Sequence, residues 1–148
     1  GDHSLVLTEW GAVFSFGENS LNQLGQPVAF GEAALDGVSP VAFPRSVAVE
    51  AVACGMAHSL ALARDGRVFS WGWDAAGQLG HGSFAAADRE RPAAVPALEG
   101  EEAAQLAAGR AHSACVTAGG EVFTWGLGRN GRLGHGDCED RPHPTRVE

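Results

Sequence analysis

A pattern that recurs about every 54 residues constrains the fold of this chain more than any other feature of its sequence. Residues 55–82 align without a gap with residues 109–136, and half of the aligned positions are identical. A third copy begins at Asp2. A fixed period of this size is typical of solenoids, propellers and arrays, in which each repeat forms one structural unit.

Two short motifs set the register of the repeat. A His-Ser pair begins at His3, His58 and His112, so the copies are offset by 55 and then 54 residues. An aromatic residue followed by glycine occupies a second equivalent position, as Phe16-Gly17, Trp71-Gly72 and Trp125-Gly126. We therefore treat residues 1–148 as one domain, divided approximately into units 1–50, 51–104 and 105–148.

Each copy has the pattern of a β-hairpin. Apolar runs at Ser59–Ala63 and Val68–Trp71 are separated by Asp65-Gly66, a strong hairpin signal because both turn residues favour positive φ. The third copy has Gly119-Gly120 instead, which suits the same turn. The first copy has Glu9-Trp10-Gly11, for which we expect a longer or bulged turn.

The repeat also decides how the remaining segments are interpreted. Glu101–Ala108 is rich in alanine and could form a helical turn, but its place in the repeat predicts a strand. Each unit then has about four strands. The sequence therefore predicts an all-β fold built of β-propeller blades, each of four antiparallel strands.

Charge and composition exclude several classes of function. The net charge of −8 and the absence of a long basic run argue against nonspecific nucleic-acid binding. No apolar run approaches the roughly 18 residues of a membrane span. Three widely spaced cysteines indicate free thiols in a reducing compartment. No signal or transit peptide is visible, although the chain does not begin with Met; we expect an intracellular protein of the cytoplasm or nucleus, with the mitochondrion also open.

The residues that could carry chemistry recur once per repeat, which favours a structural role. A catalytic Ser/His/Asp set would need one special copy, and no metal-ligand spacing occurs. The glycines of Gly126-x-Gly128-x-x-Gly131 open no helix that could hold a phosphate. We therefore predict no catalytic residue, no metal and no cofactor. We expect the recurring residues to have structural roles. The histidines would be buried and bonded to adjacent backbone: His3, His58 and His112. The aromatic residues, each followed by a glycine, would pack between blades: Phe16, Trp71 and Trp125, with Gly17, Gly72 and Gly126.

Positions that depart from the repeat are the better candidates for function, because loops on a rigid scaffold carry specificity. Trp73 is not required by the repeat, since its equivalents are Glu18 and Leu127. The candidate partner-contact residues are Trp73, Asp74, Arg89, Arg91, Arg129 and Asn130.

The repeat closely resembles that of the regulator of chromosome condensation family, over essentially all of the chain. The matching residues are Cys54-Gly55, His58-Ser59, Asp65-Gly66, Trp71-Gly72 and Gln78-Leu79-Gly80. The resemblance implies a propeller of seven four-stranded blades. Seven such repeats need more than twice 148 residues, so the chain is expected to be a segment of about three blades. Further blades or copies would then cover the open blade faces.

The same resemblance suggests three functions. The first is a non-enzymatic scaffold for protein–protein interaction. The second is a guanine-nucleotide exchange factor for a Ran-like small GTPase, and the third is a subunit or assembly factor of a large ribonucleoprotein complex, for which a mitochondrial location is open. The expected partners are proteins, with no direct contact to nucleic acid or membrane.

Overall fold

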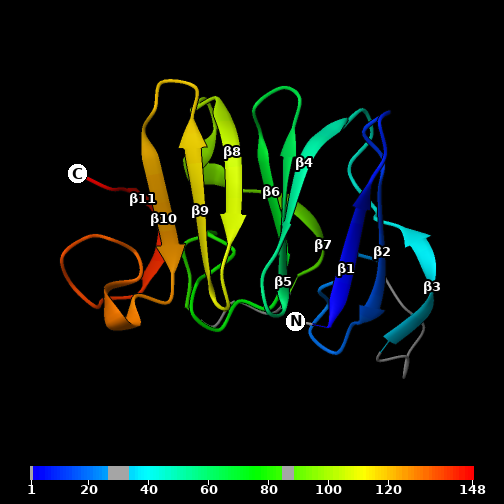
Figure 1. Ribbon diagram of the computed structural model, residues 1–148, viewed down its shortest axis with the longest axis horizontal. Coiled ribbons are helices and arrows are strands. Elements are labelled where there is room, and N and C mark those ends of the chain that lie inside the picture. The colour runs from blue at the N-terminus through cyan, green and yellow to red at the C-terminus, as the bar shows by residue number, and fades with distance from the viewer. Residues whose placement is uncertain (1, 27–33, 85–88) are drawn as a thin grey trace.

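Three antiparallel sheets stand side by side along the long axis of the molecule (Figure 1). The computed structural model describes residues 2–26, 34–84 and 89–148. The first sheet has the order β1(His3–Leu7), β2(Val13–Glu18), β3(Ala34–Pro40). The second has the order β4(Val49–Cys54), β5(His58–Ala63), β6(Val68–Gly72), β7(Arg89–Ala94). The third has the order β11(Arg141–Arg146), β10(Val122–Gly126), β9(His112–Thr117), β8(Ala103–Ala108).

This architecture is an all-β partial propeller, as the repeat predicts. The alanine-rich segment forms strand β8, which confirms the interpretation taken from the repeat register. Within residues 2–26, 34–84 and 89–148 the helices are two three-residue 3-10 turns, η1(Pro96–Leu98) and η2(Arg129–Gly131). In those same residues no helix is long and apolar enough to cross a bilayer.

The hairpin turns of the three blades are alike: the bulged turn expected for the first copy occurs in all three, and the expectation of positive φ at both turn residues of the second copy is wrong. Gly11 N donates to Thr8 O, as Gly66 N donates to Ala63 O and Gly120 N to Thr117 O. Positive φ occurs at each glycine (86°, 84° and 86°), whereas neither Trp10 nor Asp65 has positive φ. The turn is therefore a type I turn closed by a glycine bulge, in which the residue before the glycine has ordinary backbone geometry.

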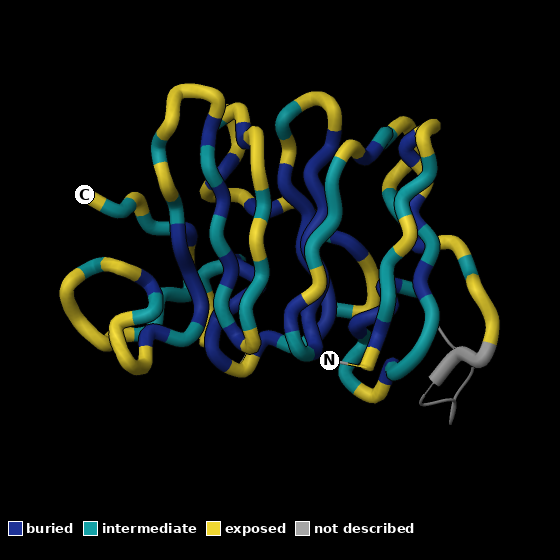
Figure 2. Tube along the Cα trace, viewed as in Figure 1, coloured by how far each residue is buried: buried dark blue, intermediate teal, exposed yellow. Residues whose placement is uncertain are grey.

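The core lies between adjacent sheets. One cluster joins the first and second blades around Phe69 and Trp71, and Phe43 packs edge-on against both rings at 5.7 and 5.6 Å between centroids. A second cluster joins the second and third blades around Leu62, Leu98 and Trp125. Burial follows this arrangement: β5 and β6 in the middle blade are buried throughout, while outer strands alternate or are exposed (Figure 2).

The blades end in two different faces. The tip face is the end that carries the hairpin turns at residues 8–11, 63–66 and 117–120. The loop face is the opposite end, which carries the segments after β2, β6 and β10 (Figure 1).

Candidate functional site

The repeated His-Ser pairs link one blade to the next. His3 Nε2 lies 2.9 Å from Ser59 Oγ in the following blade, and the Ser59 hydroxyl donates to Gln23 O at 2.8 Å. Trp71 Nε1 donates to the same carbonyl oxygen at 2.9 Å. Since the single hydroxyl hydrogen of Ser59 goes to Gln23, the histidine must donate from Nε2.

The next pair of blades repeats this arrangement. His58 Nε2 lies 3.0 Å from Ser113 Oγ, and Gln78 O accepts from both the Ser113 hydroxyl and Trp125 Nε1 at 2.8 and 2.9 Å. The histidines thus contact a side chain of the neighbouring blade, and the expectation that they bond to adjacent backbone is corrected. The physical reason is blade packing, which brings residues 55 positions apart into contact.

Burial keeps these histidines neutral. It lowers the pKa of His3 to about 4 and that of His58 to about 3, with the nearby histidines adding to the effect at His58. His112, in the last blade, is only half-buried, and burial lowers its pKa too. A neutral ring whose Nε2–H is already donated, beside a serine that donates to a carbonyl, is not a nucleophile–base pair.

The aromatic plugs are not equivalent in the structure. Trp71 and Trp125 are fully buried between blades, whereas Phe16 is half-buried. The glycine after each plug has a positive φ of 97° to 103°, and a Cβ there would lie 2.4 to 2.6 Å from a backbone carbonyl oxygen. That geometry explains why glycine recurs at Gly17, Gly72 and Gly126.

A second set of hydrogen bonds fastens each loop to its blade. Ser70 Oγ donates to Leu79 O at 2.7 Å and lies 2.9 Å from His81 Nε2. Thr124 makes the same contacts with Leu133 and His135 in the third blade. Burial, followed by the charge of Arg89, lowers the pKa of His81 to about 4. The loop histidines are therefore structural as well.

Asp74 is the candidate contact residue that the structure contradicts. It is fully buried, and its Oδ1 accepts from Leu79 N at 2.9 Å. Asn19 bonds Leu24 N in the same way in the first blade. Asp74 therefore shapes its loop from inside and is not placed to touch a partner.

The other candidates are spread over the loop face and the outer rim. Trp73 is half-buried directly after β6, and the exposed Arg129 and Asn130 begin the equivalent loop of the third blade. Arg89 is half-buried at the start of β7, opposite Gly72 in the sheet register. Arg91 is exposed farther along β7. The structure does not gather these residues into one compact site.

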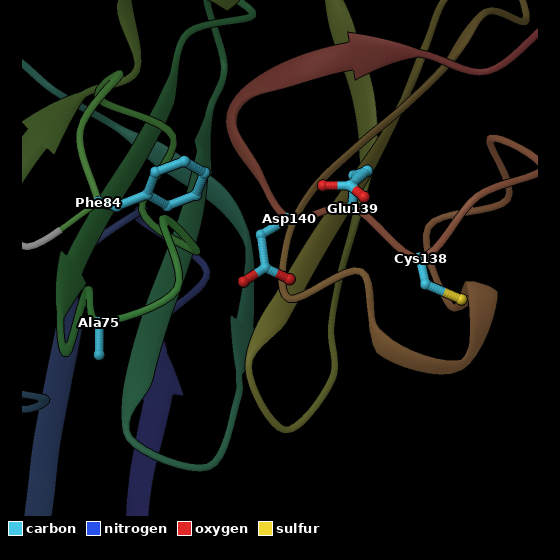
Figure 3. A pocket seen from close by; sticks show the side chains of 5 residues that line it. All are labelled: Ala75, Phe84, Cys138, Glu139 and Asp140. Atoms are coloured by element: carbon cyan, nitrogen blue, oxygen red, sulfur yellow. The ribbon is translucent and has the colours of Figure 1, made fainter.

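A cleft of about 440 Å³ lies on the loop face between the second and third blades. In Figure 3 the Phe84 ring lies to the left of the Asp140 carboxylate, with Ala75 below Phe84 and Glu139 to the right of Asp140. Phe84 is 48% exposed, and Cys138 also lines the cleft and is exposed.

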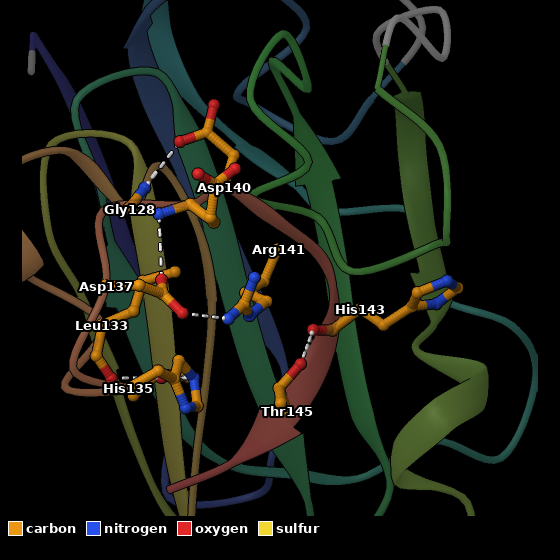
Figure 4. Close-up of polar contacts among 10 residues, drawn as sticks. Gly128, Leu133, His135, Asp137, Asp140, Arg141, His143 and Thr145 are labelled. Atoms are coloured by element: carbon orange, nitrogen blue, oxygen red, sulfur yellow. Dashed lines mark hydrogen bonds and ion pairs between the residues drawn. The ribbon is translucent and has the colours of Figure 1, made fainter.

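Hydrogen bonds fix the acidic wall of the cleft (Figure 4). Asp140 Oδ1 accepts from Gly128 N at 2.7 Å, and Asp137 pairs with Arg141 at 2.6 Å while accepting from Glu139 N at 2.9 Å. In the described part of the chain neither Glu139 nor Asp140 forms an ion pair. The wall thus presents two carboxylates without a cation.

One sequence signal marks the two loops that line the cleft, although it does not show that they meet. Phe84 and Cys138 are equivalent positions, each two residues after the Leu-Gly-His-Gly segment of its repeat. The sequences of the two loops differ directly after the shared Leu-Gly-His-Gly segment. Within residues 2–26, 34–84 and 89–148 no cluster of three or more metal-ligating side chains occurs.

Comparison with known proteins identifies the repeat. The sequence model of the regulator of chromosome condensation (RCC1) repeat matches residues 11–62, 65–116 and 119–148. Human E3 ubiquitin-protein ligase HERC2 is 42% identical over 99% of this chain, which spans 3% of that protein. Human HERC3, a probable E3 ubiquitin-protein ligase, is 40% identical over 98% of the chain, which spans 13% of its length.

Solved structures show the same fold. The crystal structure of human WBSCR16 superposes with a TM-score of 0.88 at 28% identity, covering 100% of this chain and 38% of that one. Prp20p from Saccharomyces cerevisiae, studied for its binding to Gsp1p and histones, has a TM-score of 0.85 at 26% identity, covering 99% and 36%.

Proposed function

The chain belongs to the regulator of chromosome condensation (RCC1) repeat family, and on that premise we propose that it is a non-enzymatic propeller segment that binds other proteins. The proposal rests on the observation that the recurring polar side chains and the side chains of the cleft have different surroundings. The recurring His, Ser and Thr groups bond within and between blades, while Glu139, Asp140 and Phe84 line an open cleft.

The chemistry of the cleft suggests the partner segment. An aromatic face beside two carboxylates suits a Lys or Arg side chain, whose stem packs on Phe84 while its charge meets Glu139 and Asp140. Because its curated relatives include E3 ubiquitin-protein ligases, we place this binding within a larger ligase-type protein, where it selects a partner. Three free thiols support an intracellular location.

The test compares two cleft variants with two matched surface variants in the full-length protein. Phe84→Ala and Glu139→Lys should each reduce retention of a shared set of partner proteins, measured by quantitative mass spectrometry after affinity purification. Val122→Ala and Glu90→Lys change exposed residues outside the cleft and should retain that set. Equal partner sets for all four variants would refute the proposal.

A second candidate function is nucleotide exchange on a Ran-like small GTPase. It is favoured by the likeness to Prp20p, whose binding to Gsp1p has been studied. Exchange needs no chemical step from the propeller, only tighter binding of the nucleotide-free GTPase. Release of fluorescent GDP from Ran, measured with and without the full-length protein, tests this candidate directly.

A further inference from the structure

Trp10 is exposed at a position where the fold does not need an aromatic residue. It lies in the turn between β1 and β2 and is 78% exposed. Its equivalents are Asp65 and Gly119, in turns with the same backbone hydrogen bonds. Asp65 is also exposed although its blade has a neighbour on each side, so the exposure of Trp10 belongs to the turn position.

The turn that presents Trp10 is held rigidly by two blades. Thr8 N donates to Ala12 O at 2.9 Å, and Ala12 N also donates to Thr8 Oγ1 at 3.1 Å. From the second blade, Arg64 Nη2 donates to Glu9 O at 2.9 Å. A large aromatic side chain on a fixed turn beside an arginine has the composition of an interface anchor, since it loses little conformational freedom on binding.

The same tip face carries an apolar pocket of about 170 Å³. Val95 and Leu98 line it, and the pocket lies beside the end of β7, whose Ala94 pairs with Phe69 just after the β5–β6 turn. An apolar cavity of about 150 Å³ accepts a benzene ring in another protein, so a pocket of this size can receive part of an indole.

The charges beside the tip and the pocket are complementary. The exposed Glu9 and Arg64 flank Trp10, while Arg67 and Glu99 line the pocket. Arg64 forms no ion pair within the described ranges. A second copy of the chain could therefore place Arg64 against Glu99, whereas Arg67 already pairs with Asp65 at 2.8 Å and lies over the Phe69 ring.

We propose that two copies of this chain associate through their tip faces, each inserting Trp10 into the pocket lined by Val95 and Leu98 of the other. Both features lie on the same end of the molecule, so a two-fold axis allows both tryptophans to be seated at once. This contact is separate from the loop face, so the proposed dimer does not depend on the function proposed for the cleft.

The experiment is sedimentation equilibrium of the full-length protein over a concentration series. Wild type should show a monomer–dimer equilibrium, and Trp10→Asp, which copies the turn of the second blade, should weaken association about thirtyfold or more. Trp10→Gly, which copies the turn of the third blade, should weaken association to a similar extent. Phe84→Ala, on the loop face, should leave the dimer constant unchanged.

Charge reversal provides the specific readout. Arg64→Glu and Glu99→Arg should each weaken the dimer about threefold to tenfold, and the double variant should regain most of the loss. A wild type that stays monomeric at every concentration overturns the proposal. The proposal is also overturned if neither Trp10 substitution changes the dimer constant, or if the protein assembles beyond two copies. It is overturned as well if the double variant dimerises no more tightly than the single variants.

Discussion

Replacing Ser113 with alanine tests the link between blades. The substitution removes the acceptor of His58 Nε2–H and the donor to Gln78 O, and His58 and Ser113 are both fully buried. An unpaired buried donor costs about 1–3 kcal/mol, and the lost hydrogen bond to Gln78 adds about 1 kcal/mol. We therefore expect Ser113→Ala to lower the free energy of unfolding by about 3 kcal/mol, a loss of about 6–12 °C in Tm.

The chain supplies its own control for this experiment. Ser4 is the equivalent serine of the first blade, and it is half-exposed. Ser4→Ala should therefore change stability by less than about 0.5 kcal/mol. Unfolding in urea and on heating, followed by fluorescence of the buried tryptophans, gives both values. If Ser113→Ala costs no more than Ser4→Ala, the hydrogen bonds between blades contribute nothing and the reasoning is wrong.

Three further predictions follow from burial and backbone geometry. Folding lowers the pKa of His58 to about 3, so the free energy of unfolding should be at its full value above pH 6.5 and should fall as the pH drops below 6.5. The fall should be less steep in His58→Gln. Urea midpoints measured at each pH will show the difference. Gly126→Ala should cost about 1–3 kcal/mol in urea unfolding, since φ is 98° and its Cβ would lie 2.6 Å from a carbonyl oxygen, whereas Gly119→Ala should cost little. Burial raises the pKa of Cys115 to about 11, so iodoacetamide should modify exposed Cys138 first and Cys115 only on unfolding, as peptide mapping would record.

Several local features could be predicted because the repeat shows them more than once. The strand β8 is an example: its composition suits a helix, but its register agrees with β4 in the previous blade. The turn at Asp65-Gly66 shows the limit of such reasoning. Both residues were expected to have positive φ, whereas in the structure Gly66 has it and Asp65 does not.

The candidate site was harder to predict than the fold. Asp74 follows Trp73 in a polar loop and looks exposed in sequence, yet it folds inward to bond Leu79 N. The cleft depends on Phe84 and Glu139, which lie in different repeats and share no local pattern. Such neighbours become visible only when two blades are placed against each other.

The sequence by itself determined the period of the repeat, the hairpin of each unit and the positions of the recurring aromatic and glycine residues. The chain contains each of these two or three times, so the copies can be compared without knowing how the blades pack. Only the tertiary structure decided that His58 bonds Ser113, that Asp74 is buried and that Trp10 and Phe84 are exposed at opposite ends. Those facts depend on how one blade is rotated against the next, which is set by packing between segments about 54 residues apart.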